Sequence, residues 1–373
     1  MFVNIDMKIL ILGFYSSLRK AELTMFLPLI EELENDKKIK TIFITTPFKY
    51  LENLYGELKK YNKLQIIDIF DFLRLIKSIL SSDMVFTIYG DALTNRHNFL
   101  SQVYNYFLLL LTSIFRKKIA LVSNTLFIPA FSPLLRLCSK NIKYCSVRDD
   151  RSLFICKKFF EKTSCRLRTD ISFTFFKNTS SYKKRGKKLI VCLRNNSHKI
   201  AKIKRKEYSK KTAKLIKKMC DTLNLNHVLF LSLDFGIRKV GKDCLIHEDV
   251  KRELKGSGLE TDLIKCAPNS FSLIREFQSG DIALTSRFHG IIFSISLKKP
   301  FLVVDDDYKT FYFMKSHGLE NFYITPNDIQ NRELINKILG SIFIQKNKLE
   351  KIRKDVLKKS EHHFSEIINL INV

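Results

Sequence analysis

Short apolar segments rich in β-branched residues alternate with helix-period segments, and this alternation constrains the fold more than any other feature. A first series comprises "KILILGF" (8–14), "KTIFITT" (40–46), "LQIID" (64–68), "MVFTIY" (84–89), "KIALVS" (118–123) and "KYCSVR" (143–148). Amphipathic segments such as 21–35 and 70–82 lie between them. Apolar strands separated by helices predict a parallel sheet that is covered on both faces.

A second series follows the polar, basic segment "FFKNTSSYKKRGKK" (175–188), which is the best linker in the chain. Its strands are predicted at "LIVCLR" (189–194), "HVLFLS" (227–232), "DIALTS" (281–286), "PFLVV" (300–304) and "NFYIT" (321–325). We therefore expect an α/β protein with two doubly wound domains, at 1–178 and 186–345, that face each other across a cleft. A C-terminal helix at 346–373 is expected to pack back through an apolar seam. Ligands of such folds bind at the carboxyl ends of the strands.

Composition narrows the class of protein. The chain has 373 residues, 45% of them hydrophobic, which suits two packed cores and excludes a disordered protein. The 65 Lys and Arg exceed the 37 Asp and Glu by 28, which favours an anionic partner: nucleic acid, an acidic membrane or an anionic substrate. From Lys183 to Lys218 only Glu207 opposes the basic residues. This run is either a solvated face or a surface that attracts anionic lipid or glycan.

Cysteine usage and the apolar segments bear on compartment. The eight cysteines form no CxxC pair and have no His partner at zinc spacing, so we expect reduced core thiols, a cytoplasmic protein and no metal. The N-terminal "MFVNIDMKILILGFY" reads as a first strand and not as a signal peptide. The segment "VYNYFLLLLTSIF" (103–115) is shorter than the roughly 20 residues that span a bilayer. It predicts a buried helix or, with Arg116, Lys117 and Lys118 following it, a membrane-surface contact.

The segment "SRFHG" (286–290) carries the strongest chemical signal. It follows a predicted strand and opens the apolar helix "GIIFSISL". Ser286 is a suitable N-cap, and the N-terminus of the helix favours an anion. Arg287 adds a two-point donor for a carboxylate or phosphate, and His289 can donate or transfer a proton. The alternative is that Arg287 pairs with a carboxylate and His289 caps a turn.

Two further arginines lie at predicted strand ends. Arg194 closes "KLIVCLR", where it reaches an anionic ligand or, alternatively, pairs with Asp234 or a neighbouring carboxylate. In "SVRDDRS" (146–152), Arg148 and Asp149 are expected to support the interdomain cleft, and Asp150 to cap the helix that follows.

The segment "SRFHGIIFSISLKKPFLVVDDDYKTFYFMKSHGLENF" resembles the C-terminal signature of the polysaccharide pyruvyl transferase family. That signature has a Ser-Arg-x-His corner, an apolar helix, Lys-Pro before a strand, an Asp/Lys pair and a later Gly-Leu. Upstream, "KYCSVRDDRSLFICKKF", "RTDISF" and "LIVCLR" are similar to further family segments in the same order. The N-terminal Gly-rich turns are reduced: "GFYSSLRKAEL" keeps Gly13, with Glu22 near the place of the acidic residue, and the second turn keeps Gly90 and Asp91.

The resemblance implies transfer of the enolpyruvyl group of phosphoenolpyruvate onto two sugar hydroxyls as a ketal, with release of phosphate. The acceptor would be a cell-surface polysaccharide or its lipid-linked precursor, and the donor is a substrate, so no cofactor or metal is expected. The substrate-binding residues would be Arg194, Arg287, Phe288, Lys309 and Arg148. Catalysis would involve His289, in phosphate contact or proton transfer, and Asp91 or Glu22 as the base for the acceptor.

Two other classes stay open at the sequence level. A glycosyltransferase that uses a nucleotide sugar would share the expected glycosyltransferase-B-like pair of Rossmann-like domains, with Glu320 or Glu248 near the ribose. Nucleic-acid binding is suggested by charge alone, and the sequence contains no recognisable nucleic-acid-binding module. The expected partners are therefore phosphoenolpyruvate, a saccharide acceptor and an anionic membrane surface at the cytoplasmic face, without nucleic acid.

Overall fold

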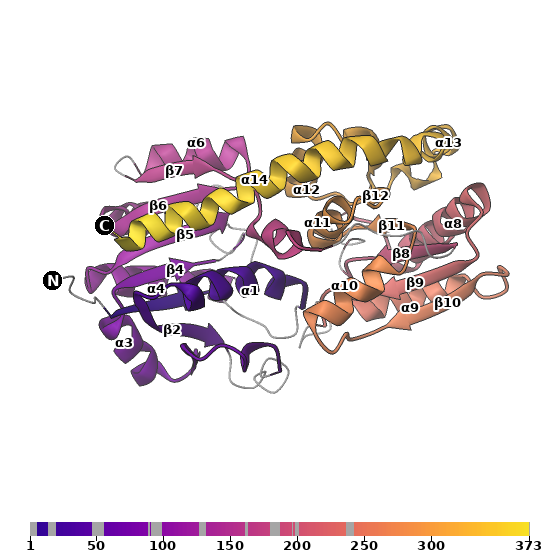
Figure 1. The fold of residues 1–373 in the computed structure, drawn as a ribbon. Helices are drawn as coiled ribbons and strands as arrows, with labels where there is room; N and C mark the ends of the chain where they lie inside the picture. The colour runs from indigo at the N-terminus through magenta and orange to yellow at the C-terminus, as the bar shows by residue number, and fades with distance from the viewer. Residues whose placement is uncertain are drawn as a thin grey trace. The chain divides into compact units, whose positions relative to one another are not determined.

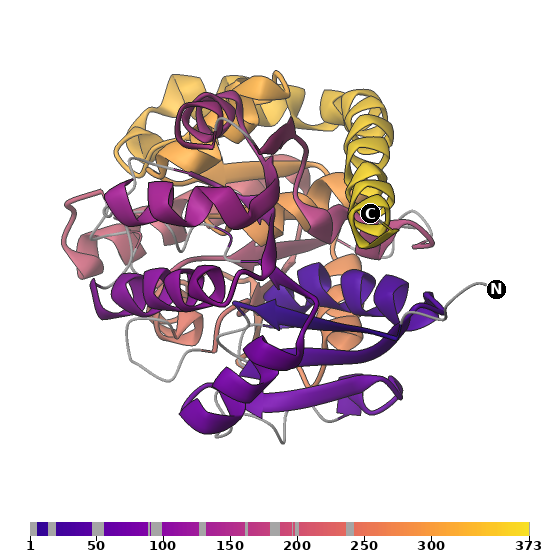
Figure 2. The same cartoon turned by 90° about the vertical axis from the view of Figure 1, so that its left-hand side faces the viewer.

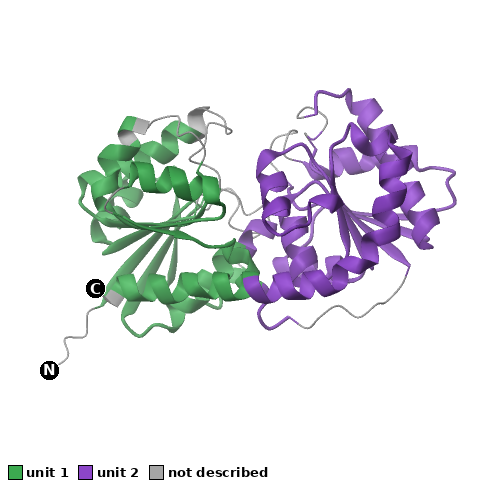
Figure 3. Cartoon of the chain, turned by 90° about the horizontal axis from the view of Figure 1, so that it is seen from above, with its two compact units in different colours: residues 1–17, 25–175, 356–373 green, residues 18–24, 176–355 purple. Residues whose placement is uncertain are grey.

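The computed structural model describes residues 6–13, 20–46, 56–88, 90, 99–126, 132–160, 163–179, 187–195, 197, 201–235 and 242–372. The chain divides into two units (Figure 3). Unit 1 consists of Met1–Ser17, Met25–Phe175 and Val356–Val373, and unit 2 of Leu18–Thr24 and Phe176–Asp355.

Unit 1 is built on a seven-stranded parallel sheet with the order β3-β2-β1-β4-β5-β6-β7 (Figure 1). Its strands are β1 (Met7–Leu12), β2 (Ile39–Thr46), β3 (Leu64–Asp68), β4 (Met84–Thr87), β5 (Lys118–Asn124), β6 (Ile142–Val147) and β7 (Ser164–Leu167). Its helices are α1 (Lys20–Asn35), α3 (Phe72–Ser81), α4 (Phe99–Ile114), α5 (Ser132–Cys138) and α6 (Asp150–Phe159), with the 3-10 turns η2 (Ser139–Asn141) and η3 (Ile171–Phe176).

The two faces of this sheet carry different helices. Leu10 and Leu12 of β1 share a buried cluster with residues of α3, α4, α5 and α6. Ile9 and Ile11 alternate with them along the strand, so they face the other side of the sheet, where they are also buried. In Figure 2 the indigo helix α1 lies on the face opposite the purple and magenta helices. The predicted doubly wound sheet is therefore confirmed for this unit.

Unit 2 is built on a six-stranded parallel sheet with the order β10-β9-β8-β11-β12-β13. Its strands are β8 (Lys188–Cys192), β9 (His227–Leu231), β10 (Glu260–Ile264), β11 (Ile282–Thr285), β12 (Phe301–Val304) and β13 (Tyr323–Ile324). Its helices are α8 (Arg205–Leu223), α9 (Asp243–Glu253), α10 (Ser270–Gln278), α11 (Phe288–Ser296), α12 (Tyr308–Ser316) and α13 (Arg332–Ser341), with η5 (Glu320–Phe322), η6 (Asp328–Gln330) and η7 (Ile342–Ile344).

The long helix α14 (Gln345–Asn372) closes the chain and contributes to both units. Its predicted apolar seam is buried at Leu349, Ile352, Val356 and Ile367. The change from unit 1 to unit 2 falls after Phe175, and the change back falls within α14 after Asp355, so the last helix does not stand apart from the two units. The centre of the predicted linker, at 180–186, lies outside the described residues.

All eleven predicted strands are present, and two strands were not predicted. Strand β7 reads "SCRL" and strand β10 reads "ETDLI". Each lies at one edge of its sheet and is only partly buried, so neither carries the continuous apolar run that marks the central strands. The helix expected at 103–115 is α4, but Val103, Phe107 and Ile114 are exposed on it, which corrects its prediction as a buried helix.

The expectation of eight reduced cysteines is wrong for one pair. Cys156 on α6 and Cys165 on β7 form a disulfide, with their Cα atoms 6.3 Å apart. The β6-α6-β7 crossover brings them together, because β7 lies beside the strand from which α6 departs. The other six are free thiols, most of them buried. Among the described helices, none combines the length and hydrophobicity that a membrane span requires.

Candidate active site

Neighbouring strands of unit 2 end in register, and each is followed by an arginine. Cys192 of β8 is paired with Thr285 of β11, and Arg194 and Arg287 each lie two residues beyond that pair. Both arginines therefore lie at the carboxyl edge of the same parallel sheet, as the sequence predicts. This edge is the place where such sheets bind ligands.

Ser286 joins the two strand ends instead of capping the helix. Its Oγ accepts hydrogen bonds from the Arg194 backbone N–H at 2.6 Å and from the Ser197 hydroxyl at 3.1 Å. The N-cap of α11 is Arg287, which makes no side-chain cap hydrogen bond. The predicted N-cap role of Ser286 is thus corrected: its buried hydroxyl accepts a backbone N–H of the segment that follows β8 and the hydroxyl of Ser197.

Gly290 allows α11 to begin close against β11. A Cβ atom at this position would lie 2.2 Å from Oγ1 and 2.9 Å from Cβ of Thr285, distances that real side chains do not adopt. The Thr285 hydroxyl also accepts a hydrogen bond from the Arg287 N–H at 3.0 Å. The glycine of "SRFHG" therefore serves packing, and it brings the first turn of α11 to the strand ends.

Arg287 is held by two buried carboxylates. Its Nε donates to both oxygens of Asp243 at 2.9 and 3.2 Å, and Nη2 donates to Asp243 Oδ1 and to Asp234 Oδ2, the latter at 3.3 Å. The alternative in which Arg287 pairs with a carboxylate is thus realised. Its side chain keeps 20% exposure, and no described residue accepts a hydrogen bond from Nη1. That nitrogen is the donor left for a ligand.

Asp243, at the start of α9, is the centre of this arrangement. Besides Arg287, its carboxylate accepts backbone N–H groups of Leu233, Asp234 and Asn195, at 3.1 to 3.3 Å. Burial raises the pKa of Asp243, and the Arg287 guanidinium opposes that shift. A carboxylate with this many donors fixes the direction in which Arg287 points.

His247, one helical turn after Asp243, is buried in a fixed neutral state. Its Nε2 accepts the Leu193 N–H at 2.9 Å, so the ring proton lies on Nδ1, which is 3.2 Å from Ser232 Oγ. Burial, together with the nearby Arg287 charge, lowers the pKa of His247 to about 3. This histidine supports the turn after β8 and has no proton to exchange near neutral pH.

Arg194 is paired with the carboxylates that follow β12. Its Nη1 donates to Asp307 Oδ2 at 3.2 Å, and Nη2 lies 3.7 Å from Asp305 Oδ2. This is the alternative in which Arg194 pairs with a neighbouring carboxylate, and the Asp234 carboxylate contacts Arg287. The Arg194 side chain is 17% exposed, whereas Asp305 is fully buried and also accepts the Thr310 hydroxyl at 2.9 Å.

Phe288, His289 and Lys309 complete this edge of unit 2. The Phe288 ring packs edge-on against Phe313, with 5.0 Å between centroids, and the Lys309 Nζ lies 4.5 Å above the Phe288 ring. His289 is half-buried in the first turn of α11, with its ring 6.4 Å from that of Phe293. Five of the predicted site residues are thus collected at the carboxyl ends of β8, β11 and β12.

The remaining predicted residues are Arg148, Glu22 and Asp91. Arg148, which follows β6 of unit 1, is almost sealed: its Nη1 lies 3.0 Å from Asp170, and its Nε donates to Ser123 Oγ at 3.2 Å. Glu22 is half-buried on α1, within the segment that groups with unit 2. Asp91 lies outside the described residues.

Next to Arg148, the predicted cap of α6 needs correction. The N-cap is Asp149, which accepts the Ser152 N–H at 2.7 Å, and Asp150 is the first residue of the helix. Asp149 has the extended backbone that a cap requires, so its carboxylate is the one that reaches back to the first turn.

Sequence reasoning missed Asp243 and His247. Both lie in "KDCLIHEDV", where an Asp begins a helix and a His follows four residues later on the same helical face. That spacing was the available signal. It was obscured because no apolar run announces α9, whose sequence is mostly polar.

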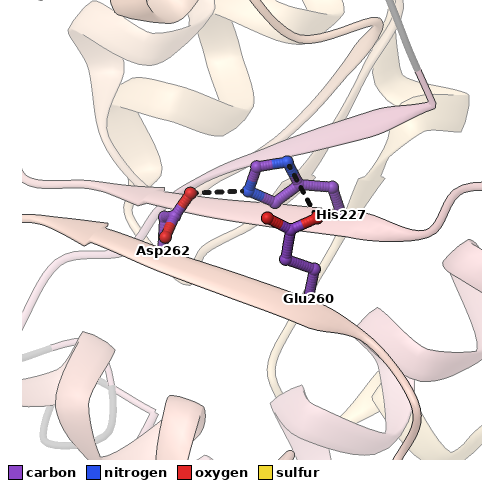
Figure 4. Close-up of side chains that lie close together, drawn as sticks. All are labelled: His227, Glu260 and Asp262. Carbon is purple, nitrogen blue, oxygen red and sulfur yellow. Dashed lines mark hydrogen bonds and ion pairs between the residues drawn. The ribbon is translucent and has the colours of Figure 1, made fainter.

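One group of described side chains could ligate a metal, at the opposite edge of the same sheet (Figure 4). His227 begins β9 and lies directly across from Glu260, the first residue of β10, with Asp262 two residues further. The His227 Nε2 lies 2.8 Å from Asp262 Oδ2. Both carboxylates are exposed, and the three side chains approach one another near the amino ends of β9 and β10, distant in register from the carboxyl ends of these strands.

A sequence model described as polysaccharide pyruvyl transferase matches residues 25–308. The match covers well over half of the chain and includes strands β2 to β12 and the "SRFHG" corner. The chain belongs to the polysaccharide pyruvyl transferase family. None of the curated proteins compared with the sequence matches it.

This member of the pyruvyl transferase family shares its fold with solved nucleotide-sugar enzymes. The UDP-GlcNAc 2-epimerase from Neisseria meningitidis, bound to UDP-GlcNAc, aligns with a TM-score of 0.63 and 13% identity over 97% of this chain and 100% of the epimerase. A putative UDP-N-acetylglucosamine 2-epimerase from Listeria monocytogenes aligns with a TM-score of 0.67 and 11% identity. This alignment covers 98% of this chain and 97% of the epimerase. An O-GlcNAc transferase mutant from Thermobaculum terrenum aligns with a TM-score of 0.53 and 11% identity. This alignment covers 99% of this chain and 67% of the transferase. At these identities the likeness establishes the two-domain α/β fold alone.

Proposed function

We propose that the chain transfers the enolpyruvyl group of phosphoenolpyruvate onto two hydroxyls of a saccharide, forming a pyruvate ketal and releasing phosphate. The family match supports pyruvyl transfer as the reaction class. The donor, the ketal product and a cell-surface or lipid-linked acceptor are the finer parts of the proposal.

The observation that carries the assignment of phosphoenolpyruvate as donor substrate is a pair of arginines, which lie at equivalent positions after two neighbouring strands of one sheet. Arg194 and Arg287 each have a guanidinium oriented by carboxylates and still partly exposed. A small molecule with both phosphate and carboxylate needs cations at fixed positions, and pre-oriented guanidinium groups lose little freedom on binding. The first N–H groups of a helix have no acceptor within the helix, so the start of α11 adds donors at the same place.

The carboxylates of this edge also set a limit on binding. The two arginines are already neutralised by four carboxylates, those of Asp234, Asp243, Asp305 and Asp307. Phosphoenolpyruvate would therefore gain binding energy mainly from N–H groups that these carboxylates do not engage, such as Arg287 Nη1. Lys309 adds a positive charge over the Phe288 ring. Such a site would bind phosphoenolpyruvate by geometry more than by net charge.

His289 is the proposed proton donor. Formation of the ketal requires a proton for the methylene carbon, which generates an oxocarbenium-like centre that the sugar hydroxyls attack. His289 is half-buried in the first turn of α11, two residues beyond Arg287, and histidine exchanges protons near neutral pH. Glu22 and Asp91 remain the candidate bases for the acceptor hydroxyl.

The test is phosphate release from phosphoenolpyruvate across a panel of saccharides and lipid-linked saccharides. Arg287→Lys keeps a charge beside Asp243 but loses the planar fork, so donor affinity should fall at least tenfold. The matched control is Arg252→Lys, since Arg252 forms an exposed pair with Asp249. His289→Gln should retain donor affinity while turnover falls by about 10²–10⁴, with His317→Gln as its control. Unchanged kinetics in both site variants would refute the assignment.

A second candidate is transfer from a nucleotide sugar, which the shared fold keeps open because the similar Neisseria meningitidis epimerase structure is bound to UDP-GlcNAc. The expected ribose partners support it little: Glu248 forms an ion pair with Lys265 at 2.6 Å, and Glu320 is exposed. Thermal shifts with phosphoenolpyruvate and with UDP-sugars should separate the two. Stabilisation by UDP-sugars alone would favour this second candidate.

A further inference from the structure

The outer faces of α3 and α4 in unit 1 present apolar side chains at positions where helices of water-facing surfaces are normally polar. Six of them form this surface, which we call the α3–α4 surface: Phe72, Leu73, Leu80, Val103, Phe107 and Ile114. Leu73 is 82% exposed and Ile114 63%. On α4, Val103, Phe107 and Ile114 follow one another at four and seven residues, so they form one stripe along the helix.

The two helices lie side by side, so the six residues make one continuous surface. The Phe72 and Phe107 rings stack with centroids 6.1 Å apart. The Tyr104 hydroxyl donates to the Ile69 carbonyl at 3.1 Å, just before α3, and the Lys117 Nζ donates to the Leu80 carbonyl at 2.7 Å. The inner faces, including Leu75 and Leu109, are buried in the core of the unit.

Most of the charged side chains beside this surface are basic. Arg74 and Lys77 are exposed on α3, and Arg116 and Lys118 are exposed just beyond α4. Neither helix contains an acidic residue. The acidic residues at the two ends of α3 are engaged by backbone: Asp71 accepts the Arg74 N–H at 3.0 Å, and Asp83 accepts the Lys8 N–H at 2.7 Å.

We propose that the α3–α4 surface docks on the headgroup region of an anionic lipid bilayer. Exposed apolar side chains flanked by Lys and Arg on one face are the pattern of interfacial helices that bury their apolar residues at the boundary between headgroups and acyl chains. The neighbouring basic residues add attraction to anionic lipids. This inference does not depend on the proposed reaction.

Other occupants fit the surface less well. Two copies of the chain, joined through this surface by a two-fold axis, would place more basic than acidic side chains against one another, which gives a net repulsion. A single-stranded nucleic acid would use aromatic platforms for stacking, but Leu73, Leu80, Val103 and Ile114 are aliphatic. Hydrocarbon with anionic headgroups complements both the aliphatic and the basic residues.

The first experiment measures co-sedimentation of the full-length chain with vesicles of phosphatidylcholine alone or with added phosphatidylglycerol. Leu73→Gln with Ile114→Gln should lower the partition coefficient at least tenfold on anionic vesicles. Arg74→Gln with Lys77→Gln should lower it about tenfold or more, and this loss should shrink as salt is raised. All four positions are exposed, so thermal unfolding should stay close to that of the parent.

Matched controls lie in unit 2. Ile344→Gln removes an apolar side chain that is 73% exposed, and Lys210→Gln with Lys214→Gln removes two exposed charges from α8, within the basic run after Lys183. Both controls should bind vesicles as the parent does. Equal losses in the controls, or no binding by the parent, would overturn the proposal, because attraction would then be absent or due to overall charge.

A second experiment uses the absence of tryptophan from the sequence. Leu73→Trp provides a single reporter, whose emission should shift to shorter wavelength on anionic vesicles and be quenched by lipids brominated in the acyl chain. Ile344→Trp should respond to neither. A shift of the Leu73→Trp emission with protein concentration in the absence of lipid would identify a second copy as the occupant. A shift with single-stranded RNA and not with vesicles would identify nucleic acid. Either result would overturn the proposal.

Discussion

Both units place an arginine within two residues of the end of a parallel strand, but in different surroundings. In unit 1, the side chains of Arg148 and its partner Asp170 are 6% and 0% exposed. In unit 2, Arg194 and Arg287 are 17% and 20% exposed, although carboxylates hold each of them. The same sequence signal thus produces a sealed ion pair in one unit and an oriented, accessible cation in the other.

The difference comes from the residues that pack around each guanidinium. Beside Arg148, Ser123 and Asp170 are both buried, and Ser123 Oγ also accepts the Ile171 N–H at 3.1 Å, so the pocket is filled by the chain itself. Beside Arg287, Gly290 and the first turn of α11 occupy the edge without covering the guanidinium. Ionisable residues at a strand end therefore indicate a ligand site only when the next segment of the chain leaves them accessible.

The largest expected effect is on unit 1. Arg148→Met removes the partner of a fully buried carboxylate and should lower the free energy of unfolding by about 3–5 kcal/mol. Urea unfolding of parent and variant measures it. The control Arg166→Met, which breaks a pair 55% exposed on the arginine side, should cost less than about 1 kcal/mol. A small loss for Arg148→Met, accompanied by weaker donor binding, would instead make Arg148 a ligand residue like those of unit 2.

The fold was predictable from sequence to the extent that apolar continuity reveals it. Central strands such as β1 and β8 are buried on both faces and are visible as uninterrupted runs, whereas β7 and β10 are half-exposed edges whose sequences resemble loops. Chain direction and alternation with helices then fix a parallel sheet.

The candidate site was predictable only in part. Three site residues could be recognised from the sequence because polar or charged side chains stand out at the ends of apolar strands and at the start of an apolar helix. They are Arg194, Arg287 and His289. Asp243 and His247 come from a polar segment, and their contacts with Arg287 and Leu193 depend on how α9 packs on β8 and β9. Pairings between residues 44 and 54 positions apart follow from tertiary packing, which local patterns do not encode.

The next effect concerns the close approach of α11 in unit 2. Gly290→Ala places a methyl group against Thr285 and should cost about 1–3 kcal/mol of stability, since neither the strand nor the helix can move without breaking the Arg287 corner. Thr285→Ala removes the atom nearest to the new methyl group, so the double variant should lose less than the sum of the single losses. Strictly additive losses would show that the two residues do not touch.

A smaller effect is the pH dependence of stability, to which each unit contributes one buried histidine. Burial and the Arg287 charge lower the pKa of His247 in unit 2 to about 3, and burial lowers the pKa of His363 in unit 1 to about 4, from an ordinary value near 6.5. The unfolded chain then binds more protons than the folded one, so stability falls as pH falls below 6.5.

For each histidine the loss between pH 6.5 and 5 should be on the order of 1–2 kcal/mol, from linkage applied to one group that stays neutral when folded. His247→Gln and His363→Gln should each remove one such contribution from the pH dependence of urea unfolding, whatever their effect at pH 7. A variant that keeps the full parental slope would mean that its histidine is protonated in the folded state.

The smallest effect compares the glycine at the carboxyl edge of unit 1 with Gly290. Gly90 has a φ of +63°, in the left-handed region, and a Cβ there would lie 3.6 Å from Arg148 Nη2, which is ordinary contact with the nearest described atom. Gly90→Ala should therefore cost only the conformational penalty of an L residue in that region, about 1 kcal/mol. Gly90→Asn should cost less, because asparagine tolerates left-handed backbone, whereas Gly290→Asn should be worse than Gly290→Ala. Urea unfolding should therefore rank the same two substitutions in opposite order at the two glycines. Backbone conformation limits the residue at position 90, and space limits the residue at position 290. The same ranking at both positions would contradict this distinction.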